Sequence, residues 1–588
     1  MKQWNFLQPD PEIMGRIERH LGCSPIISAL LVNRGIHSEP QAEQFLDFSF
    51  QRLTSPDSFT DMDKAARRIY HAIIHQQHIL IFGDYDVDGI TGTALLHDFL
   101  KITGALVSCY IPHRETEGYG LQKRHINNDA LCRGINLIIT VDCGSSSHDV
   151  MPAARQAGID IIVTDHHAIS DAIPEALAVI NPKRKDCSSL AENLAGVGVV
   201  YFLIIYLRKY LRDMGFWISR NEPNLKNYCD LVALGTIADL VPLTCDNRIF
   251  VKNGMDMLST GKRAGIRSLI EISGIKAAAI DTEDIAFKLA PRLNAAGRME
   301  HAGTALRLLL ESDVCKAKEL AQSLNALNTQ RKYVEQQIFD EIRQRICAHP
   351  EQFNEMALVI AGKDWAPGVL GIVASRLVQL YFLPVILIAV QNGVGKGSAR
   401  SIPGFDIFQG IHACADCLIR YGGHALAGGL EINADRIPEF QMRFNRIAGS
   451  KITGEQRVVH IGVDRVLNLE DISESLISDM DLLKPYGMGN PEPVFYTNHV
   501  HVASSKIVGN NTRRMILKPV DRSSHPGILA VQFNCDPRIP TGQDIEEMVY
   551  RLRWNYWNGS RTMQILVEDA KFSLQSDSSE SIMTFNTG

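Results

Sequence analysis

The sequence lacks several features that would place it in a special class of protein. Its longest apolar run, Val197 to Leu207, is too short to span a bilayer and is typical of a core helix. Met1 to Asn5 lack the basic and then apolar pattern of a signal peptide. The 12 cysteines among 588 residues form no disulfide framework, which is typical of reduced thiols in the cytosol. We therefore expect a cytoplasmic protein that does not associate with membranes.

An excess of positive charge is also missing. The formal net charge is −6, with 45% hydrophobic and 21% charged residues, as in an ordinary globular protein. This charge balance does not by itself indicate a nucleic-acid-binding protein. An anionic substrate would therefore have to be bound by local basic patches or by metal ions. The length predicts several domains with a large buried core.

Three closely spaced carboxylates follow one apolar strand. Ile79 to Phe82 is predicted to be a buried strand, and Asp84, Asp86 and Asp88 come directly after it. In an extended backbone, alternate residues would point to one side. Like charges held together usually persist because a cation neutralises them, and Mg2+ or Mn2+ suits oxygen ligands. A solvated acidic turn is the alternative when this motif is taken alone.

Two later strands end in similar residues. Between residues 60 and 260 helical segments alternate with predicted strands at 79–82, 106–111, 137–141 and 159–163. This alternation predicts a parallel sheet, in which ligands bind beyond the carboxyl ends of the strands. Asp142 follows the third strand, and Asp165-His166-His167 follows the fourth. The histidines could form a satisfied surface pair, but the three strand ends together favour metal ligation. Asp239 follows an apolar helix, where the helix dipole disfavours a carboxylate unless a cation is near.

The middle of the chain supplies candidate phosphate-binding segments. A loop is expected at Pro291 to Met299, and a long helix at Val314 to Ile346 is expected to connect two lobes, with a coiled coil as the weaker alternative. A second α/β unit follows over about 355–450. It carries three glycine-rich segments, each with or beside Lys, Arg or His: a helix start at residues 365–376 and loops at residues 395–401 and 422–429. Such loops let backbone amides approach a phosphodiester closely.

The last part of the chain is rich in predicted strands. Five are expected, at residues 457–463, 500–508, 514–517, 528–533 and 563–567, and they fit a small OB-type barrel. Arg514 lies on one basic segment, and Arg553, Trp554 and Tyr556 lie on another where basic and aromatic residues alternate. Cations for the backbone and rings for the bases are what single-stranded nucleic acid requires. A barrel with an aromatic core and an ordinary charged surface is the alternative. The polar tail from Ser573 is expected to be disordered.

Several of these segments resemble one known family. Residues 84–89, 141–144, 165–167 and Asp239 resemble the motifs of the DHH phosphoesterase superfamily, and residues 422–429 resemble the motif of its accessory DHHA1 domain. Residues 34–36, 291–299, 365–376 and 486–491 are in addition similar to the RecJ exonucleases, in the order of that family. The resemblance covers about residues 10–570.

The resemblance implies a 5′→3′ exonuclease that acts on single-stranded DNA in recombination and mismatch repair, uses two Mn2+ or Mg2+ ions and releases mononucleotides. The implied metal ligands are Asp84, Asp86, Asp142, His166, His167 and Asp239. Asp88 and Asp165 are expected to assist catalysis beside Asp142 and His167, Asp165 by orienting the histidine pair. The implied phosphate-binding residues are Asn294, Arg298, Ser398, Arg400, Gly423 and His424. A monomer is expected, with single-strand binding protein and a RecQ-type helicase as partners.

The expected fold is α/β, with two α/β lobes joined by a long helix and a C-terminal OB-type β-barrel. The expected parts are an N-terminal helical segment (1–50), a DHH catalytic domain (51–300), connecting helices (301–350), a DHHA1 domain (351–452), an OB domain (453–573) and a flexible tail (574–588). Two other functions stay open at this point. One is a phosphoesterase of short oligonucleotides, cyclic dinucleotides or pyrophosphate, and the other is a non-catalytic DNA-binding replication protein.

Overall fold

The computed structural model describes residues 2–573 apart from residues 129–133, 170–171, 277–279, 351–354, 454–457, 510, 521–525, 537–538, 540 and 558–559. The tail expected over 574–588, and Arg457 at the start of one expected strand, lie outside the described residues. The chain forms two compact units. The first comprises residues 1–46, 459–486 and 490–588, and the second comprises residues 47–458 and 487–489. Within the described residues, no helix is both long and apolar enough to cross a membrane.

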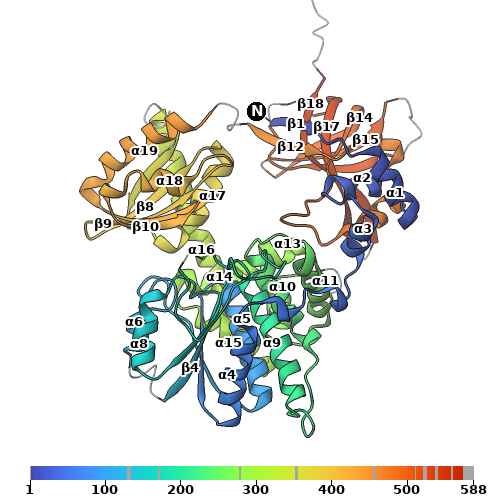
Figure 1. The fold of residues 1–588 in the computed structure, drawn as a ribbon. Helices are drawn as coiled ribbons and strands as arrows, with labels where there is room; N and C mark the ends of the chain where they lie inside the picture. The colour runs from blue at the N-terminus through green and yellow to red at the C-terminus, as the bar shows by residue number, and fades with distance from the viewer. Residues whose placement is uncertain are drawn as a thin grey trace, which may run out of the picture. The chain divides into compact units, whose positions relative to one another are not determined.

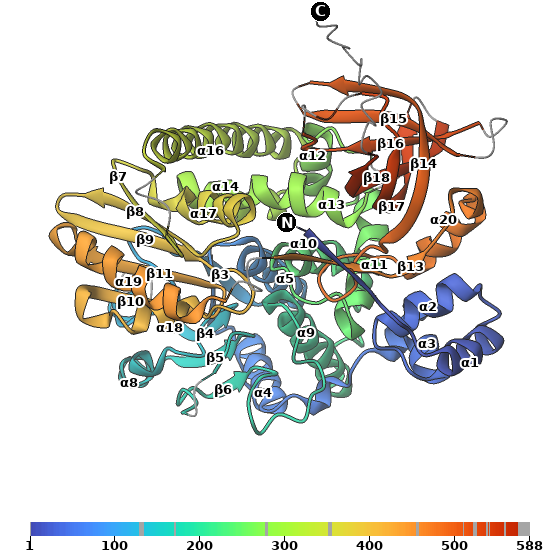
Figure 2. The same cartoon turned by 90° about the horizontal axis from the view of Figure 1, so that it is seen from above.

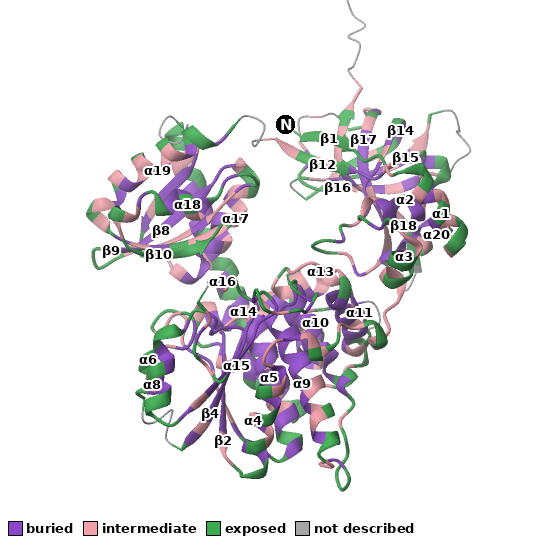
Figure 3. Ribbon diagram, in the orientation of Figure 1, coloured by how far each residue is buried: buried purple, intermediate pink, exposed green. Residues whose placement is uncertain are grey.

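The second unit contains a five-stranded parallel sheet. Its strand order is β3 (Leu106–Tyr110), β2 (His78–Gly83), β4 (Ile135–Val141), β5 (Asp160–Thr164) and β6 (Ala178–Ile180). The strands have continuous apolar sequences because helices cover both faces of the sheet, so side chains on either side of a strand are buried. Figure 1 shows α4 (Met62–Ile74) and α5 (Val87–Thr103) on one side, and α6 (Lys123–Ile126) and α8 (Met151–Gln156) on the other. The predicted parallel α/β sheet is thus confirmed, and the sheet is among the buried elements in Figure 3.

Further helices complete this part of the unit. They are α9 (Gly196–Asp213), α10 (Cys229–Ala238), α11 (Cys245–Thr260), α12 (Ala264–Ile272), α13 (Thr282–Asp284), α14 (Ala290–Met299) and α15 (Gly303–Leu310). The apolar side chains of α4, α5, α9 and α10 form one core with the sheet. The loop expected at Pro291 to Met299 was wrong, because these residues form α14, with Pro291 in its first turn, where proline costs no hydrogen bond.

A long helix joins the parallel sheet to a second sheet of the same unit. α16 (Val314–Ala348) has 35 residues, and Asp313 caps it by accepting hydrogen bonds from the amides of Cys315 and Lys316. It contacts α12 and α14 on one side and α17 (Pro367–Tyr381) on the other. Figure 2 shows α16 beside α14 and α17. The predicted connecting helix is therefore confirmed.

The second sheet of this unit is mixed. Its order is β10 (Leu418–His424), β11 (Ala427–Asn433), β9 (Val394–Arg400), β8 (Val385–Gln391) and β7 (Leu358–Lys363), and only β7 and β8 are parallel. α17, α18 (Ile407–His412) and α19 (Ile437–Lys451) pack against it. Two of the three glycine-rich segments are strands and not the expected loops. Residues 395–401 lie almost wholly in β9, and residues 422–429 form the β10–β11 hairpin.

The first unit combines both ends of the chain. α1 (Pro11–Leu21), α2 (Pro25–Asn33) and α3 (Glu39–Leu46) share one apolar core with a closed barrel. The barrel strands are β14 (Phe495–Val508), β15 (Thr512–Pro519), β16 (Ile528–Gln532), β18 (Ser560–Phe572) and β17 (Ile545–Trp557). The β14–β17 pairing closes the barrel, and β13 (Arg465–Val466) and α20 (Glu474–Met480) lie beside it. The predicted five-stranded OB-type barrel is confirmed.

The assignment of one strand in this unit was wrong. The strand expected near residues 457–463 is β12 (Val459–Val463), which pairs in parallel with β1 (Lys2–Phe6) outside the barrel. The fifth barrel strand is instead β17, in which basic and aromatic residues alternate. β1 was also missed, because a strand of five mostly exposed residues has no clear apolar period of its own.

Candidate metal centre

The carboxyl ends of three neighbouring strands carry the candidate site. Gly83 lies opposite Val141, and Val141 lies opposite Thr164, so the residues that follow β2, β4 and β5 are adjacent. The ladder continues for one more step, since the amide of Asp84 donates to the Val141 carbonyl and that of Asp142 to the Thr164 carbonyl. Sheet register therefore places Asp84, Asp142 and the Asp165-His166-His167 run together.

The first motif does not have the extended backbone that its alternation suggested. α5 begins at Val87, so Asp86 caps the helix by accepting a hydrogen bond from the Gly89 amide at 3.1 Å. Asp88 therefore lies in the first helical turn. The expectation that all three carboxylates point to one side of a strand was wrong, because the helix turns the chain between Asp86 and Asp88.

Asp88 is buried and reaches a different element. Its carboxylate accepts hydrogen bonds from the amides of Gly196 (2.6 Å) and Val197 (2.8 Å) at the start of α9. Free amides at a helix N-terminus favour a carboxylate. The helix α9 is thus held against the first motif through Asp88.

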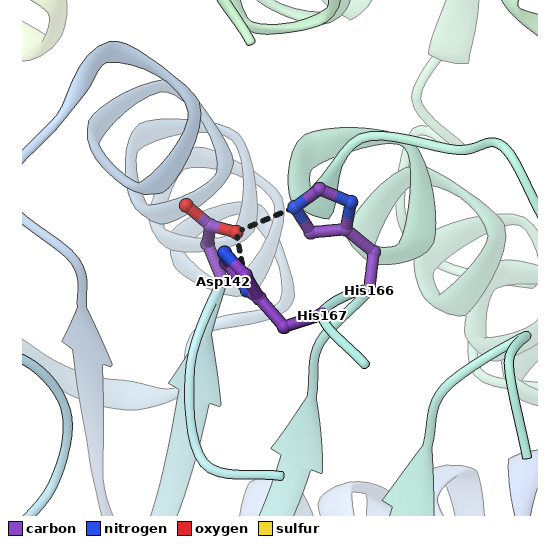
Figure 4. Close-up of side chains that lie close together, drawn as sticks. All are labelled: Asp142, His166 and His167. Atoms are coloured by element: carbon purple, nitrogen blue, oxygen red, sulfur yellow. Dashed lines mark ion pairs between the residues drawn. The ribbon is translucent and has the colours of Figure 1, made fainter. Parts of the chain in front are cut away.

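The two histidines lie on either side of Asp142. The His166 Nε2 atom is 3.1 Å from Asp142 Oδ1 and 3.5 Å from Asp239 Oδ2. The His167 Nδ1 atom is 3.7 Å from Asp142 Oδ1 and 2.8 Å from Asp165 Oδ1. Figure 4 shows both rings directed at the Asp142 carboxylate. Asp239 comes from the end of α10, so four elements contribute to one cluster.

Asp165 orients the histidine pair through its hydrogen bonds. One of its oxygens accepts from the backbone amides of His166 (2.8 Å) and His167 (3.1 Å), and the other accepts from the amide of Ser145 (2.9 Å). Tyr119 adds a contact that the sequence gave no sign of. Its hydroxyl donates to the Asp142 carbonyl at 3.0 Å and lies 3.1 Å from His167 Nδ1.

The electrostatics of the cluster favour a bound cation. Burial, together with Asp86, raises the pKa of Asp84 well above its usual range and that of Asp88 to about 7. Burial and then Asp88 raise the pKa of Asp142 well above its usual range and that of Asp239 to about 8. Asp84 Oδ1 and Asp142 Oδ1 are buried and have no hydrogen-bond partner among the described residues. A cation would remove both the repulsion and the missing contacts.

The histidines have opposite electrostatic surroundings. Burial, followed by the nearby His167, lowers the pKa of His166 to about 3, so its ring is neutral and offers a lone pair. Burial alone would also lower the pKa of His167, but its hydrogen bond with Asp165 raises that pKa to about 9. Because histidine binds a metal ion only in its neutral form, a bound ion would favour loss of one of the two ring protons of the His167 imidazolium.

Three overlapping groups of side chains have the spacing of metal ligands. In each group the ligand atoms lie within 4.8 Å of one another. The groups are Asp84–Asp86–Asp142, Asp142–His166–His167 and Asp88–His166–Asp239. Asp142 belongs to the first two, which fits a carboxylate shared between two ions. All seven candidate atoms are carboxylate oxygens or imidazole nitrogens, which suit Mn2+ and Mg2+.

A group of arginines lies beside the cluster. Arg298 on α14 donates from Nη1 to the carbonyl of Gly368 on α17 at 2.9 Å. Its burial, with the charges of Arg114, Arg331 and Arg400, lowers the pKa of Arg298 to about 9. Burial and then Arg114 likewise lower the pKa of Arg400. Cations held together in this way offer a site for a phosphate.

Sequence reasoning missed Arg114. It lies in the loop after β3, with its guanidinium 4.8 Å from the centre of the Tyr85 ring. β3 neighbours β2 in the parallel sheet, so its carboxyl end belongs to the same edge as Asp84. A search of the residues after every predicted strand would have found it.

The other predicted phosphate-binding residues of this unit have varied positions. Asn294 faces the first motif, where its Oδ1 accepts from the Val87 amide at 3.2 Å. Ser398 lies beside Arg400 on β9, with its hydroxyl 3.4 Å from Arg400 Nη1. Gly423 and His424 lie at the exposed β10–β11 hairpin. Burial, then the charges of Arg400 and His167, lower the pKa of His424, which places this hairpin within electrostatic reach of the cluster.

The predicted DNA-binding residues of the barrel divide into two pairs. Arg514 and Tyr556 are exposed. Arg553 forms an ion pair with Glu492, with Nε 2.8 Å from Oε1. The indole of Trp554 donates to Asp481 and lies 4.3 Å from the Arg561 guanidinium. Of these four predicted residues, Arg553 and Trp554 make contacts within the unit, and Arg514 and Tyr556 are exposed.

Comparison with known proteins gives consistent matches along the chain. Residues 78–236 match the model of the DHH family N-terminal domain, residues 354–450 that of the DHHA1 domain, and residues 463–569 that of the RecJ OB domain. The single-stranded-DNA-specific exonuclease RecJ of Bacillus subtilis is 35% identical over 97% of this chain and 71% of its own. The protein of the same name from Escherichia coli is 34% identical over 93% of this chain and 95% of its own.

A solved structure shows the same similarity. The crystal structure of RecJ in complex with Mn2+ from Thermus thermophilus matches 97% of this chain and 79% of its own, with a TM-score of 0.82 and 28% identity.

Proposed function

The chain belongs to the RecJ family of single-stranded-DNA-specific exonucleases, and on that premise we propose that it digests single-stranded DNA from the 5′ end and releases mononucleotides. The observation that carries the proposal is the cluster around Asp142, where ligand groups for two ions share one carboxylate. A role in DNA recombination and repair, including mismatch repair, rests on the same premise.

Two Mn2+ or Mg2+ ions would be held by Asp84, Asp86, Asp142, His166, His167 and Asp239. The buried, unpartnered oxygens of Asp84 and Asp142 fit this role, and relatives of the family have been solved with both ions. When bound, such ions lower the pKa of a water molecule and stabilise negative charge on a phosphate. Asp88 has both carboxylate oxygens occupied by the amides of α9, so its role is to position α9 and the first motif.

Side chains of both sheets would hold the DNA strand. Arg298, Arg400 and Arg114 would bind a phosphate beside the bond to be broken, with Ser398 and His424 as further contacts. Hydrolysis adds the elements of water: the phosphorus gains a hydroxyl and its bond to the 3′ oxygen of the terminal nucleotide breaks. That oxygen leaves with a proton, so the products are a 5′-mononucleotide and a strand one residue shorter with a 5′ phosphate.

The barrel distinguishes this proposal from the small-substrate alternative. The region of residues 463–569 matches the RecJ OB domain, which a phosphoesterase of dinucleotides does not require. Arg514 and Tyr556 are the exposed cation and ring that would contact the incoming strand. The cytoplasmic location, the monomeric state and the partners, single-strand binding protein and a RecQ-type helicase, rest on the resemblance alone and stay predictions.

The polarity of digestion is tested with end-labelled DNA. We expect a long single strand labelled at its 5′ end to release labelled mononucleotide at once in Mn2+ or Mg2+, while a 3′ label stays in long products. The matching duplex serves as the control and should be digested poorly. Hydrolysis of short oligonucleotides alone would favour the small-substrate phosphoesterase, and tight binding with no hydrolysis in either metal would favour the non-catalytic binding protein.

A glycine beside the cluster gives a prediction about metal affinity. A Cβ atom on Gly196 would lie 2.8 Å from both Cβ and Oδ1 of Asp142. Gly196→Ala should therefore displace Asp142, and we expect the affinity for Mn2+ to fall by about 10- to 100-fold, as when a supporting residue of a metal site is lost. Titration with Mn2+, followed by calorimetry or electron paramagnetic resonance, measures the change.

The matched control is Gly198→Ala on the same helix. A Cβ there would meet the Cδ2 atom of Leu194 at 3.1 Å, and a leucine side chain can move aside. We expect its Mn2+ affinity to stay within about threefold of the wild-type value, since volume changes of one methyl are tolerated where neighbours can move. Equal affinities in Gly196→Ala and the wild type would contradict the crowded geometry.

A further inference from the structure

Two cysteines outside the metal centre lie close together and have no part in the function proposed so far. Cys414 and Cys417 are separated by two residues, and no other two of the 12 cysteines are so near in sequence. They lie between α18 and β10, which Figure 2 shows next to α19. Both are free thiols, and both belong to the apolar core that α18 and α19 share with the mixed sheet.

The backbone between the two cysteines has a form that a disulfide can bridge. The short 3-10 helix η8 (Ala415–Cys417) follows Cys414, and the Cys417 amide donates to the Cys414 carbonyl at 3.0 Å. A turn closed by such a bond brings its first and fourth Cα atoms within about 7 Å of each other. Disulfides join Cα atoms that are about 4.4–6.8 Å apart. The pair is therefore close enough for a bond between the two sulfur atoms.

Two guanidinium groups contact one of these sulfur atoms. Cys417 Sγ accepts from Nη1 of Arg443 at 3.4 Å and from Nη2 of Arg436 at 3.7 Å. Two carboxylates hold these arginines in turn. Arg443 donates to Asp416 at 2.6 Å, and Nη2 of Arg436 is 3.1 Å from Glu439. Charged donors of this kind stabilise a thiolate, which is the nucleophilic form of cysteine.

The same arginines argue against a metal ion at this place. Asp416, Cys417 and Glu439 have possible ligand atoms within 4.8 Å of one another. The two carboxylates are already paired with arginine, and a further cation beside two guanidinium groups would be repelled. The cluster therefore suits reaction at the sulfur better than metal binding.

The two thiols differ in their surroundings. Burial raises the pKa of the Cys414 thiol to about 11, against the opposing charge of Arg443. Cys414 is fully buried, and Cys417 is 4% exposed. The side chains of Arg443 and Arg436 on the Cys417 sulfur are 30% and 41% exposed, so this sulfur lies one side chain below the surface. A small oxidant can reach it when these side chains change rotamer, and Cys417 is the thiol that reacts first.

We propose that Cys414 and Cys417 are a redox pair, which hydrogen peroxide oxidises to a reversible disulfide within the chain. The Cys417 thiolate attacks one peroxide oxygen, the O–O bond breaks, and the hydroxide that leaves takes up a proton to become water. Cys417 is then a sulfenic acid. The Cys414 sulfur loses its proton and attacks the Cys417 sulfur, and the hydroxyl group leaves with that proton as a second water. Two thiols are thus oxidised to one disulfide, and one peroxide is reduced to two waters. This inference does not depend on the proposed function.

Mass spectrometry of the full-length protein after brief treatment with hydrogen peroxide tests the proposal. We expect the peptide that contains Cys414 and Cys417 to lose two hydrogen atoms, and dithiothreitol to restore them. Cys315 and Cys347 are the internal control. Both are exposed and lie on α16, about 48 Å apart along the helix, so they cannot form a disulfide with each other. In the native protein a bulky thiol reagent should label this control pair and not Cys414 or Cys417.

Substitutions separate the roles of the residues. Cys414→Ser should stop the reaction at the Cys417 sulfenic acid, which dimedone traps, and Cys417→Ser should leave Cys414 reduced. Arg443→Gln should slow the oxidation about tenfold, because it removes a charged donor to the sulfur. Arg446→Gln is the matched control, an exposed arginine on the same helix, and should leave the rate unchanged.

Three results would overturn the proposal. One is a Cys414–Cys417 peptide that stays reduced while Cys315 and Cys347 are oxidised. Another is an equal rate of oxidation in Arg443→Gln and Arg446→Gln. The third is oxidation of Cys414 in Cys417→Ser as fast as in the wild type.

Discussion

Asp142→Ala should abolish hydrolysis of single-stranded DNA, with a fall in kcat of at least about 1,000-fold. Asp142 belongs to two of the ligand groups, so its loss removes a ligand from both proposed ions. Stabilisation of a phosphoryl charge by metal ions supplies several kcal/mol of the barrier reduction, which corresponds to a factor of this size. Single-turnover digestion of labelled DNA in Mn2+ measures the effect.

The same variant should keep its affinity for DNA and its fold. The exposed barrel residues Arg514 and Tyr556, and the arginine group around Arg298, are separate side chains that the substitution leaves in place. Without metal, Asp142→Ala should unfold at a temperature no lower than the wild type, because it removes one of several buried carboxylates that repel each other. Added Mn2+ should raise the Tm of the wild type and not that of the variant. Near-normal turnover in a well-folded variant would show that the cluster is not the catalytic centre.

Arg298→Met should lower kcat/KM for single-stranded DNA by about 100-fold or more, the loss typical when one group that stabilises transition-state charge is removed. The side chain is held by the Gly368 carbonyl in the midst of Arg114, Arg331 and Arg400. Because Arg298 is proposed to contact a phosphate, its removal should also make the slope of log affinity against log salt concentration shallower by about one. Digestion rates and DNA affinities at several salt concentrations measure both quantities.

The stability of Arg298→Met separates a binding role from a structural one. Burial and three neighbouring cations disfavour the charge on Arg298 in the free protein, so an apolar side chain of similar size should not lower the Tm. Arg292→Met on the same helix is the control. Arg292 donates to the Lys288 carbonyl and to Asn325, and we expect less than about a threefold change in kcat/KM. A large loss of stability in Arg298→Met, or equal losses of activity in both variants, would contradict the proposed phosphate contact.

Much of the metal centre could be predicted from the sequence because its residues follow strands. The run Ile79–Phe82 is apolar at every position, which marks a strand buried on both faces, and the first polar residues after such a strand mark the carboxyl edge of the sheet. The same reasoning found Asp142 and the Asp165-His166-His167 run. It overlooked Arg114, although the strand before it was predicted, because only strand ends that carry carboxylates or histidines were considered.

Local pattern was misleading where the backbone changes direction. Asp84, Asp86 and Asp88 alternate as in a strand, yet the cap formed by Asp86 starts a helix between them. The glycine-rich segments at 395–401 and 422–429 read as loops, and they form strands because pairing with their neighbours in the sheet outweighs the low strand preference of glycine. In the barrel, β17 was overlooked and β12 was assigned in its place, since the sequence of one strand does not show which other strand it pairs with.

By itself the sequence determined which chemical groups stand at the strand ends, the long connecting helix and four of the five strands of the C-terminal barrel. These features depend on apolar periodicity and on the order of residues along the chain, which are local properties. The tertiary structure alone decided which groups meet. Asp88 binds the start of α9, 108 residues further on, and Asp239 reaches His166 from the end of α10. Such contacts depend on how whole helices pack on the sheet, and no local pattern records that packing.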